Sequence, residues 1–162
     1  MVVQQAGAGA DWVERLRGWI LAVLGLGLIG TVTELVLLEH YEKPLQFVPL
    51  LLIVAALATI IWHLGRHDAA SLRSLQIVMM LFVLAGFVGI VAHFIGSAEF
   101  QLELDPSMDK WELVEKVMRA QAPPVLAPGM MLQLGLLGLA YVYSDRRRRV
   151  GAAGLRAEMY KE

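Results

Sequence analysis

The chain has 162 residues, 57% of them hydrophobic, and a mean hydropathy of +0.59, which is higher than soluble domains usually have. It contains no cysteine, so disulfides, thiolate metal sites, iron–sulfur clusters and cysteine nucleophiles are excluded. Its net charge of −1 conceals a strong asymmetry along the chain.

Four long apolar runs account for most of the hydrophobic residues. They cover residues 18–38, 45–64, 75–96 and 125–143. Each is close to the ~20 residues that an α-helix needs to cross a bilayer. Transmembrane β-strands would instead alternate in hydrophobicity, which these runs do not. We therefore predict one all-α membrane domain over residues 1–162, a polytopic antiparallel bundle of four transmembrane helices.

The first run carries an acidic residue, Glu34, in the half that leads to the first outward turn. An acid that faces lipid costs up to about 2.5–3.5 kcal/mol, so we expect Glu34 to face the other helices. It shares a helical stripe with Gly27 and Thr31. Small residues of this kind mark the faces where membrane helices approach each other closely.

The second run ends near His63, and His67 follows four residues later. On one continuous helix this spacing would place both imidazoles on the same face, as in metal sites. Gly65 lies between them, however, and favours the end of the helix there. We interpret both histidines as residues of the membrane interface.

The third run contains His93, about one turn before its outer end, on a helical stripe with Gly86, Gly89 and Gly96. This stripe also predicts a side chain that faces the bundle. Since Glu34 and His93 are expected at similar depths, our main structural prediction is an intramembrane pair of these two residues.

Residues 97–124 form the largest segment outside the apolar runs. Polar and apolar residues alternate from Glu99 to Asp105, which predicts a short strand or an extended arm. Asp105 and Pro106 then predict the cap and the first residue of an amphipathic helix that reaches about Ala120. This helix should lie on the outer membrane surface or cover the bundle.

The fourth run holds Gln133 near its middle, and we expect this amide to hydrogen-bond to another helix. Four consecutive arginines follow the run almost at once. Beside a membrane, such a cluster is typical of an anchor that contacts anionic lipid, and we predict no nucleic-acid partner. The cluster consists of Arg146, Arg147, Arg148 and Arg149.

The distribution of basic residues predicts the orientation of the chain. Ten of the 14 lysines and arginines lie in the N-terminal segment, the loop 65–74 and the tail 144–162, and the other four lie on the opposite side. The positive-inside rule then places both termini and the tail in the cytoplasm, and residues 97–124 outside it. We expect a multi-pass protein of the cell (inner) membrane.

The glycines of the runs indicate a function in assembly. Close helix packing is expected at Gly27, Gly30, Gly86, Gly89, Gly135 and Gly138. Together with the acidic outer segment, these faces favour a non-catalytic accessory or assembly subunit of a membrane complex. Its partners would be the lipid bilayer and other membrane subunits or further copies of itself. The sequence has neither a phosphate-binding loop nor a nucleophile elbow.

Two alternatives stay open at this point. Imidazole, carboxylate and thioether groups at one depth would suit a transition metal or a haem, as in a membrane redox component with a site near the outer face. The candidate ligands are Glu34, His40, His93 and Met130. The pair Glu34 and His93 would alternatively carry protons in a small proton-linked transporter.

Overall fold

The computed structural model describes the backbone of residues 2–39, 41–42, 44–119 and 126–159, and the side chains of residues 12–39, 41–42, 44–119 and 126–146. Every element within these ranges is helical. The elements are α1 (Val2–Leu37), the short 3-10 helix η1 (Pro44–Gln46), α2 (Phe47–Arg66), α3 (Ala69–Leu104), α4 (Lys110–Met118) and α5 (Leu126–Met159).

Four helices are long and apolar enough to cross a membrane, which confirms the predicted fold class. The candidate spans are Trp12–Leu37, Pro44–Arg66, Ala69–Leu104 and Leu126–Arg146. The helices α1, α3 and α5 have 36, 36 and 34 residues, so each is about 50 Å long and extends beyond its apolar run.

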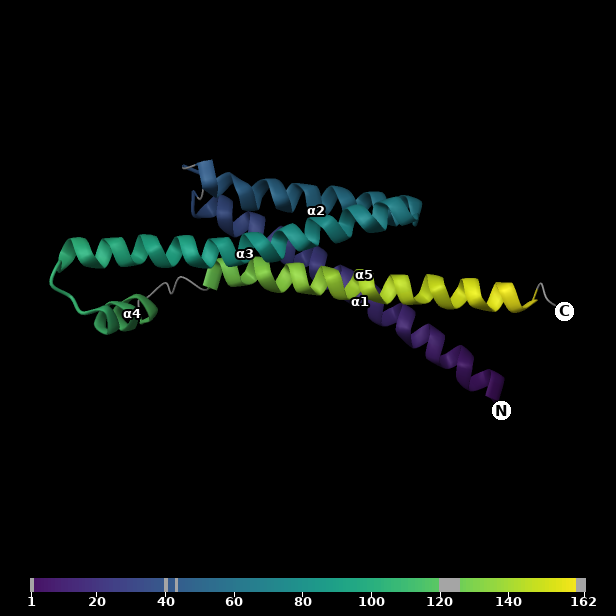
Figure 1. The fold of residues 1–162 in the computed structure, drawn as a ribbon. Helices are drawn as coiled ribbons and strands as arrows, with labels where there is room; N and C mark the ends of the chain where they lie inside the picture. Colours follow the sequence, from purple (N-terminus) through teal and green to yellow (C-terminus); the bar gives the residue numbers. More distant parts are fainter. Residues whose placement is uncertain (1, 40, 43, 120–125, 160–162) are drawn as a thin grey trace.

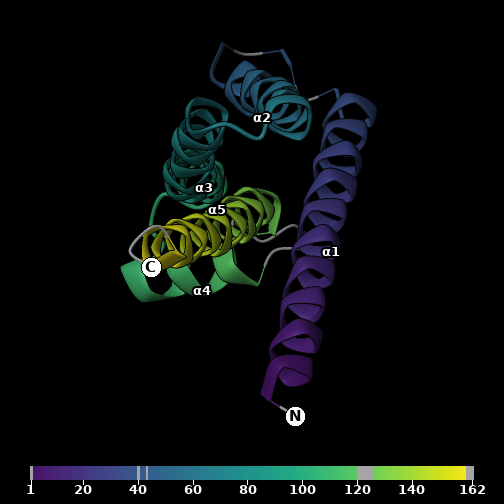
Figure 2. The same cartoon turned by 90° about the vertical axis from the view of Figure 1, so that its right-hand side faces the viewer.

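The spans form a ring of antiparallel neighbours. Figure 1 shows α3 and α5 side by side, with both chain termini at one end of the bundle and α4 at the other. Seen along the bundle in Figure 2, α2 and α5 each lie between α1 and α3. Packing is most extensive between α3 and α5, followed by α2 with α3 and α1 with α5. The core is therefore centred on the α3–α5 contact.

Glycine permits this contact because it has no side chain to keep the two backbones apart. A Cβ added at Gly86 of α3 would lie 2.9 Å from the backbone nitrogen of Leu132 and 3.0 Å from the carbonyl oxygen of Pro128. A Cβ added at Gly135 of α5 would lie 2.9 Å from the carbonyl oxygen of Met79. Backbone atoms cannot move aside as a side chain can, so any larger residue forces the helices apart.

The other predicted packing glycines divide into two groups. Gly89 faces Pro128, Gly138 faces the side chain of Met79, and Gly27 of α1 faces Leu134 of α5. Gly30, in contrast, has no atom within 4 Å of the place where a Cβ would be. Five of the six glycines thus lie at helix contacts within this chain.

The predicted strand from Glu99 to Asp105 is wrong, because α3 continues to Leu104 and the N–H of Asp105 still bonds to the carbonyl of Gln101 at 3.0 Å. The segment contains glutamate, glutamine and leucine, which favour helix, and no β-branched residue. Its alternation was too short to outweigh these propensities.

The start of the amphipathic helix is also shifted from the prediction. Asp109 caps α4 by accepting a hydrogen bond from the N–H of Trp111 at 3.2 Å. Asp105 instead closes the preceding turn, where it accepts hydrogen bonds from the hydroxyl and the N–H of Ser107 at 2.7 and 3.1 Å. These bonds favour the carboxylate and lower the pKa of Asp105 below its ordinary value.

The glycine contact predicts a sharp difference between two alanine variants of the same helix. Gly86→Ala should destabilise the protein by about 1–3 kcal/mol, because the new methyl group meets backbone atoms. Gly96→Ala, where no atom lies within 4 Å, should be neutral or slightly stabilising. Reversible denaturation in detergent micelles measures both values, and equal effects would contradict the packing described.

Candidate functional site

Five polar or charged side chains are buried among the described residues, and four of them connect to one cluster. The five are Arg17, Thr31, His63, Ser71 and Asp145. All except Thr31, which bonds to the carbonyl of Gly27 in its own helix, belong to the cluster together with Tyr141. The cluster takes residues from α1, α2, α3 and α5, at the end of the bundle that holds the chain termini.

An ion pair between Arg17 of α1 and Asp145 of α5 joins the first span to the last. Both side chains are buried, with 8% and 6% of their surfaces exposed. A buried charge that loses its counter-charge typically costs 3–5 kcal/mol. Each residue therefore requires the other, although they are 128 positions apart in the chain.

Tyr141 lies at the centre of the cluster. The guanidinium carbon of Arg17 is 5.3 Å from the centroid of the Tyr141 ring, within the range of a cation–π contact. The ring of His63 meets the same ring edge to face, with centroids 5.8 Å apart. One aromatic ring of α5 thus contacts polar side chains of both α1 and α2.

The geometry around Ser71 fixes the role of the imidazole of His63. The Ser71 hydroxyl donates its one proton to the carbonyl oxygen of Asp68 at 3.0 Å, and Nδ1 of His63 lies 3.0 Å from the same hydroxyl oxygen. Since the hydroxyl proton is already engaged, this oxygen accepts and Nδ1 of His63 donates. His63 therefore carries a proton on Nδ1.

A two-residue corner between α2 and α3 holds His63 and Ser71 together. His67 ends α2 in the left-handed region (φ 51°), and its N–H bonds to the carbonyl of His63 at 2.9 Å. Asp68 then caps α3 by accepting the N–H of Ser71 at 2.7 Å, and this bond is the main reason that the pKa of Asp68 is lowered. His67 is exposed, with its ring 5.6 Å from that of His63.

A further contact extends this end of the bundle toward the tail. Arg146 of α5 donates a hydrogen bond to the side-chain oxygen of Gln76 in α3. The side chains of Arg147, Arg148 and Arg149 lie outside the described part of the chain. The predicted lipid contact of the arginine cluster stays a prediction.

The predicted pair of Glu34 and His93 is not among the hydrogen bonds and ion pairs seen between described residues, and it stays a prediction. Both side chains are exposed. The buried stripe of α1 runs through Leu28, Thr31 and Leu35, which turns Glu34 about 100° away from it. His93 lies on the same stripe of α3 as Gly86 and Gly89. It comes one turn after Gly89, however, and Gly89 already packs on Pro128 in the first turn of α5.

The other proposed metal ligands lie partly outside the described residues, and the metal site stays a prediction. His40 lies outside the described residues, and Met130 is 41% exposed on the outer surface of α5. Among the residues that the structure describes, no group of three or more histidine, aspartate or glutamate side chains is placed to hold a metal ion.

Sequence reasoning missed the cluster, although one signal was present. Asp145 lies seven residues after Gly138, on the same face of α5, so the glycine stripe could have been extended to it. Arg17 gave no comparable signal, because the residues at its helical spacing, Leu24 and Leu28, resemble those on every other face of α1.

Comparisons with known proteins add no family to this description. Neither the models of protein families, nor the curated proteins, nor the solved structures gave a match to the chain.

The ion pair predicts a strong dependence on both partners. Asp145→Leu should destabilise the protein by about 3–5 kcal/mol, because Arg17 keeps its charge in a buried place. The double variant Arg17→Met/Asp145→Leu should recover much of the loss. Arg73→Met, which changes an exposed arginine of α3, is the matched control and should have little effect. Additive losses in the double variant, measured by denaturation in detergent, would contradict the pair.

The proton on Nδ1 of His63 predicts a ranking of two conservative variants. The amide nitrogen of asparagine can replace Nδ1, whereas that of glutamine extends toward the place of Nε2. His63→Asn should therefore keep the bond to Ser71 and be more stable than His63→Gln by about 0.5–1.5 kcal/mol. Thermal denaturation of the two variants measures the difference, and the opposite ranking would show that Nδ1 is not the donor.

Proposed function

We propose that this protein is a non-catalytic accessory or assembly subunit that binds another membrane protein through the outer face of α5. The observation that carries the proposal is Gln133. Its side chain is exposed on the outside of the bundle, and it has no hydrogen-bond partner among the described residues.

The depth of Gln133 makes this exposure costly in a lone bundle. The adjacent residue Leu134 packs on Gly27, which lies in the middle part of the span Trp12–Leu37. An amide without a hydrogen-bond partner in hydrocarbon costs several kcal/mol, and no water reaches this depth. Polar side chains inside membranes typically bond across to a neighbouring helix, and the helices of this chain do not supply such a bond.

The residues around Gln133 suit a close helix contact. Gly129, one turn before it, has no atom within 4 Å of the place of a Cβ, and Ala140, two turns after it, is exposed. Met130 and Leu136 on the same side are 41% and 53% exposed. A face with small residues, an amide and flanking apolar side chains combines the features that drive association in lipid, where apolar area alone gives no advantage.

The buried cluster supports a scaffolding role over a catalytic one. Its arginine, aspartate, serine and imidazole Nδ1 are bonded to one another or to the α2–α3 corner. These contacts hold the four spans in place. The groups engaged in them are not presented to a substrate.

The location of the protein is part of the same proposal. Most basic residues belong to the end of the bundle where both termini lie (Figure 1), which supports cytoplasmic termini in a cell (inner) membrane. In this orientation α4 and the residues around it are extracytoplasmic, and the Gln133 face is buried in the bilayer.

The proposal is tested by photo-cross-linking in native membranes. A photoreactive phenylalanine analogue at Leu136 should give a protein adduct of defined mass, which Gln133→Leu or Ala140→Leu reduces several-fold. Ala58→Leu enlarges an exposed alanine of α2 in the same way and should leave the adduct unchanged. Ala140→Leu acts because the larger side chain prevents close approach of a second helix.

Two results would contradict the proposal. One is labelling of lipid alone at Leu136, with the same result from a probe at Leu84 on the outside of α3. The other is an equal loss of adduct in the Ala58→Leu and Ala140→Leu variants.

A further inference from the structure

The helix α4 has an apolar surface that the rest of the chain covers only in part. At about 100° per residue, Leu113 and Val117 lie on one side of it, and Trp111, Val114 and Met118 lie on the adjacent side. Val117 is completely buried and α4 packs on α3, so the first side faces the bundle. Trp111, Val114 and Met118 are 75%, 38% and 46% exposed.

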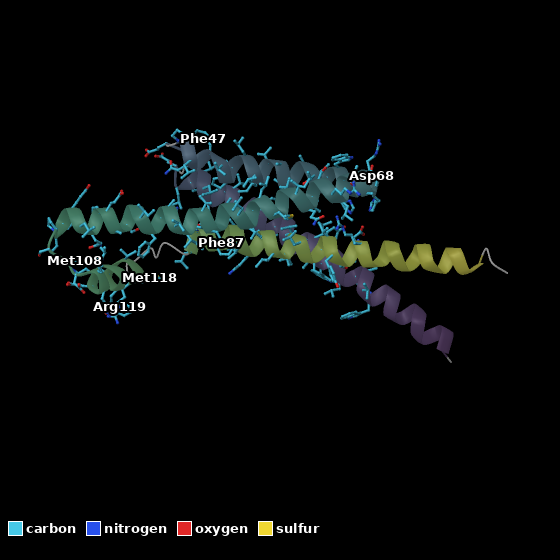
Figure 3. All side chains as sticks on the ribbon, viewed as in Figure 1. Phe47, Asp68, Phe87, Met108, Met118 and Arg119 are labelled. Atoms are coloured by element: carbon cyan, nitrogen blue, oxygen red, sulfur yellow. The ribbon has the colours of Figure 1, made fainter. Side chains whose placement is uncertain are left out.

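The opposite side of α4 is charged and balanced within itself. Lys116 pairs with Glu112 at 3.2 Å, and Arg119 pairs with Glu115 at 3.0 Å, each one turn apart along the helix. Figure 3 shows Arg119 on the side of α4 that is turned away from α3. The helix therefore has three sides, one against α3, one charged and directed to water, and one apolar and uncovered.

The direction of α4 differs from that of the spans. In Figure 1 it is seen nearly end-on beside the outer part of α3, whereas in Figure 2, turned by 90°, it extends across the view. Its axis therefore runs across the bundle axis. Since α3 and α5 cross the bilayer, α4 lies along the plane of the bilayer.

The level of α4 is that of the outer boundary of the membrane. Gly89 of α3 packs on Pro128 in the first turn of α5, and α3 continues for 15 residues, or about 22 Å, beyond this contact. α4 packs against α3 and lies between the outer end of α3 and the start of α5 (Figure 1). A helix at this level, parallel to the surface, has headgroups and the ends of acyl chains beside it.

We propose that the side formed by Trp111, Val114 and Met118 inserts into the headgroup–acyl boundary of the outer leaflet, and that its partner is lipid. The side is apolar and exposed, as the outer surfaces of the spans are, and tryptophan is enriched at this boundary because its ring is apolar and its N–H polar. Lys110, at the first position of α4, has a stem long enough to bring its charge to the headgroups.

The charge of α4 predicts which kind of lipid is sufficient for its apolar side to insert. The two internal ion pairs leave no excess of basic groups on its charged side, and the neighbouring residues Glu99, Glu103 and Asp105 are acidic. Lys110 is likewise offset by Asp109 beside it, so α4 with its cap has no net charge and the contact rests mainly on apolar area. Insertion should occur in zwitterionic lipid and should not respond to added salt.

The experiment uses the full chain, which has no native cysteine, in phosphatidylcholine vesicles. Met118→Cys and the matched variant Lys116→Cys, on the charged side of the same helix, carry an environment-sensitive fluorophore. At position 118 the emission should shift to the blue, and a lipid-attached quencher should reduce it several-fold more than aqueous iodide does. At position 116 iodide should be the stronger quencher. Circular dichroism checks that both variants keep the helical fold.

Each other outcome overturns the proposal. Equal quenching by iodide at both positions means that the apolar side faces water. Protection of position 118 from both quenchers means that protein covers it, and dilution of the protein in lipid then distinguishes a second copy from a contact within the chain. A blue shift that appears only with anionic lipid, or is lost in salt, means that charge holds the helix.

Discussion

The close approach of α3 and α5 is the contact on which the rest of this bundle depends. Apolar side chains gain little by meeting each other inside a bilayer, so helices there associate through close packing and hydrogen bonds. Gly86 and Gly135 remove the side chains that would separate the two backbones. Around this pair α2 packs on α3, and α1 packs on α5 and α2, which leaves most of the surface of α1 directed outward.

Polar contacts take the place of the close-packed glycines at the end of the bundle that holds the chain termini. Beyond Gly138, α5 carries Tyr141 and Asp145 on its inward side, and these residues contact α1 and α2 across the cluster. This connection is more specific than the packing of leucines, because a buried arginine requires a counter-charge and few side chains can supply one. The two ends of the bundle thus differ, with polar bonds at one and the crosswise helix α4 at the other.

The sequence predicts the spans well and the side-chain contacts poorly, for physical reasons. Length and hydropathy decide whether a helix can cross a bilayer, and both are properties of a continuous segment. Which side of the helix faces inward depends on its neighbours. Glu34 illustrates the difference, since its approximate depth could be inferred but the inward stripe passes through Leu35 beside it. Asp145 shows the reverse, because its place among arginines concealed an inward position that helical spacing alone would have indicated.

The distance along the chain between the partners of the ion pair has a consequence for biosynthesis. His63 and Ser71 are eight residues apart and can meet as soon as the corner between their helices exists, whereas Asp145 is synthesised 128 residues after Arg17. Until then the guanidinium of Arg17 must stay among lipid phosphates, since it has no counter-charge to enter the bundle with. The ring of four helices therefore closes only after Asp145 has been synthesised and the fourth span has met the first.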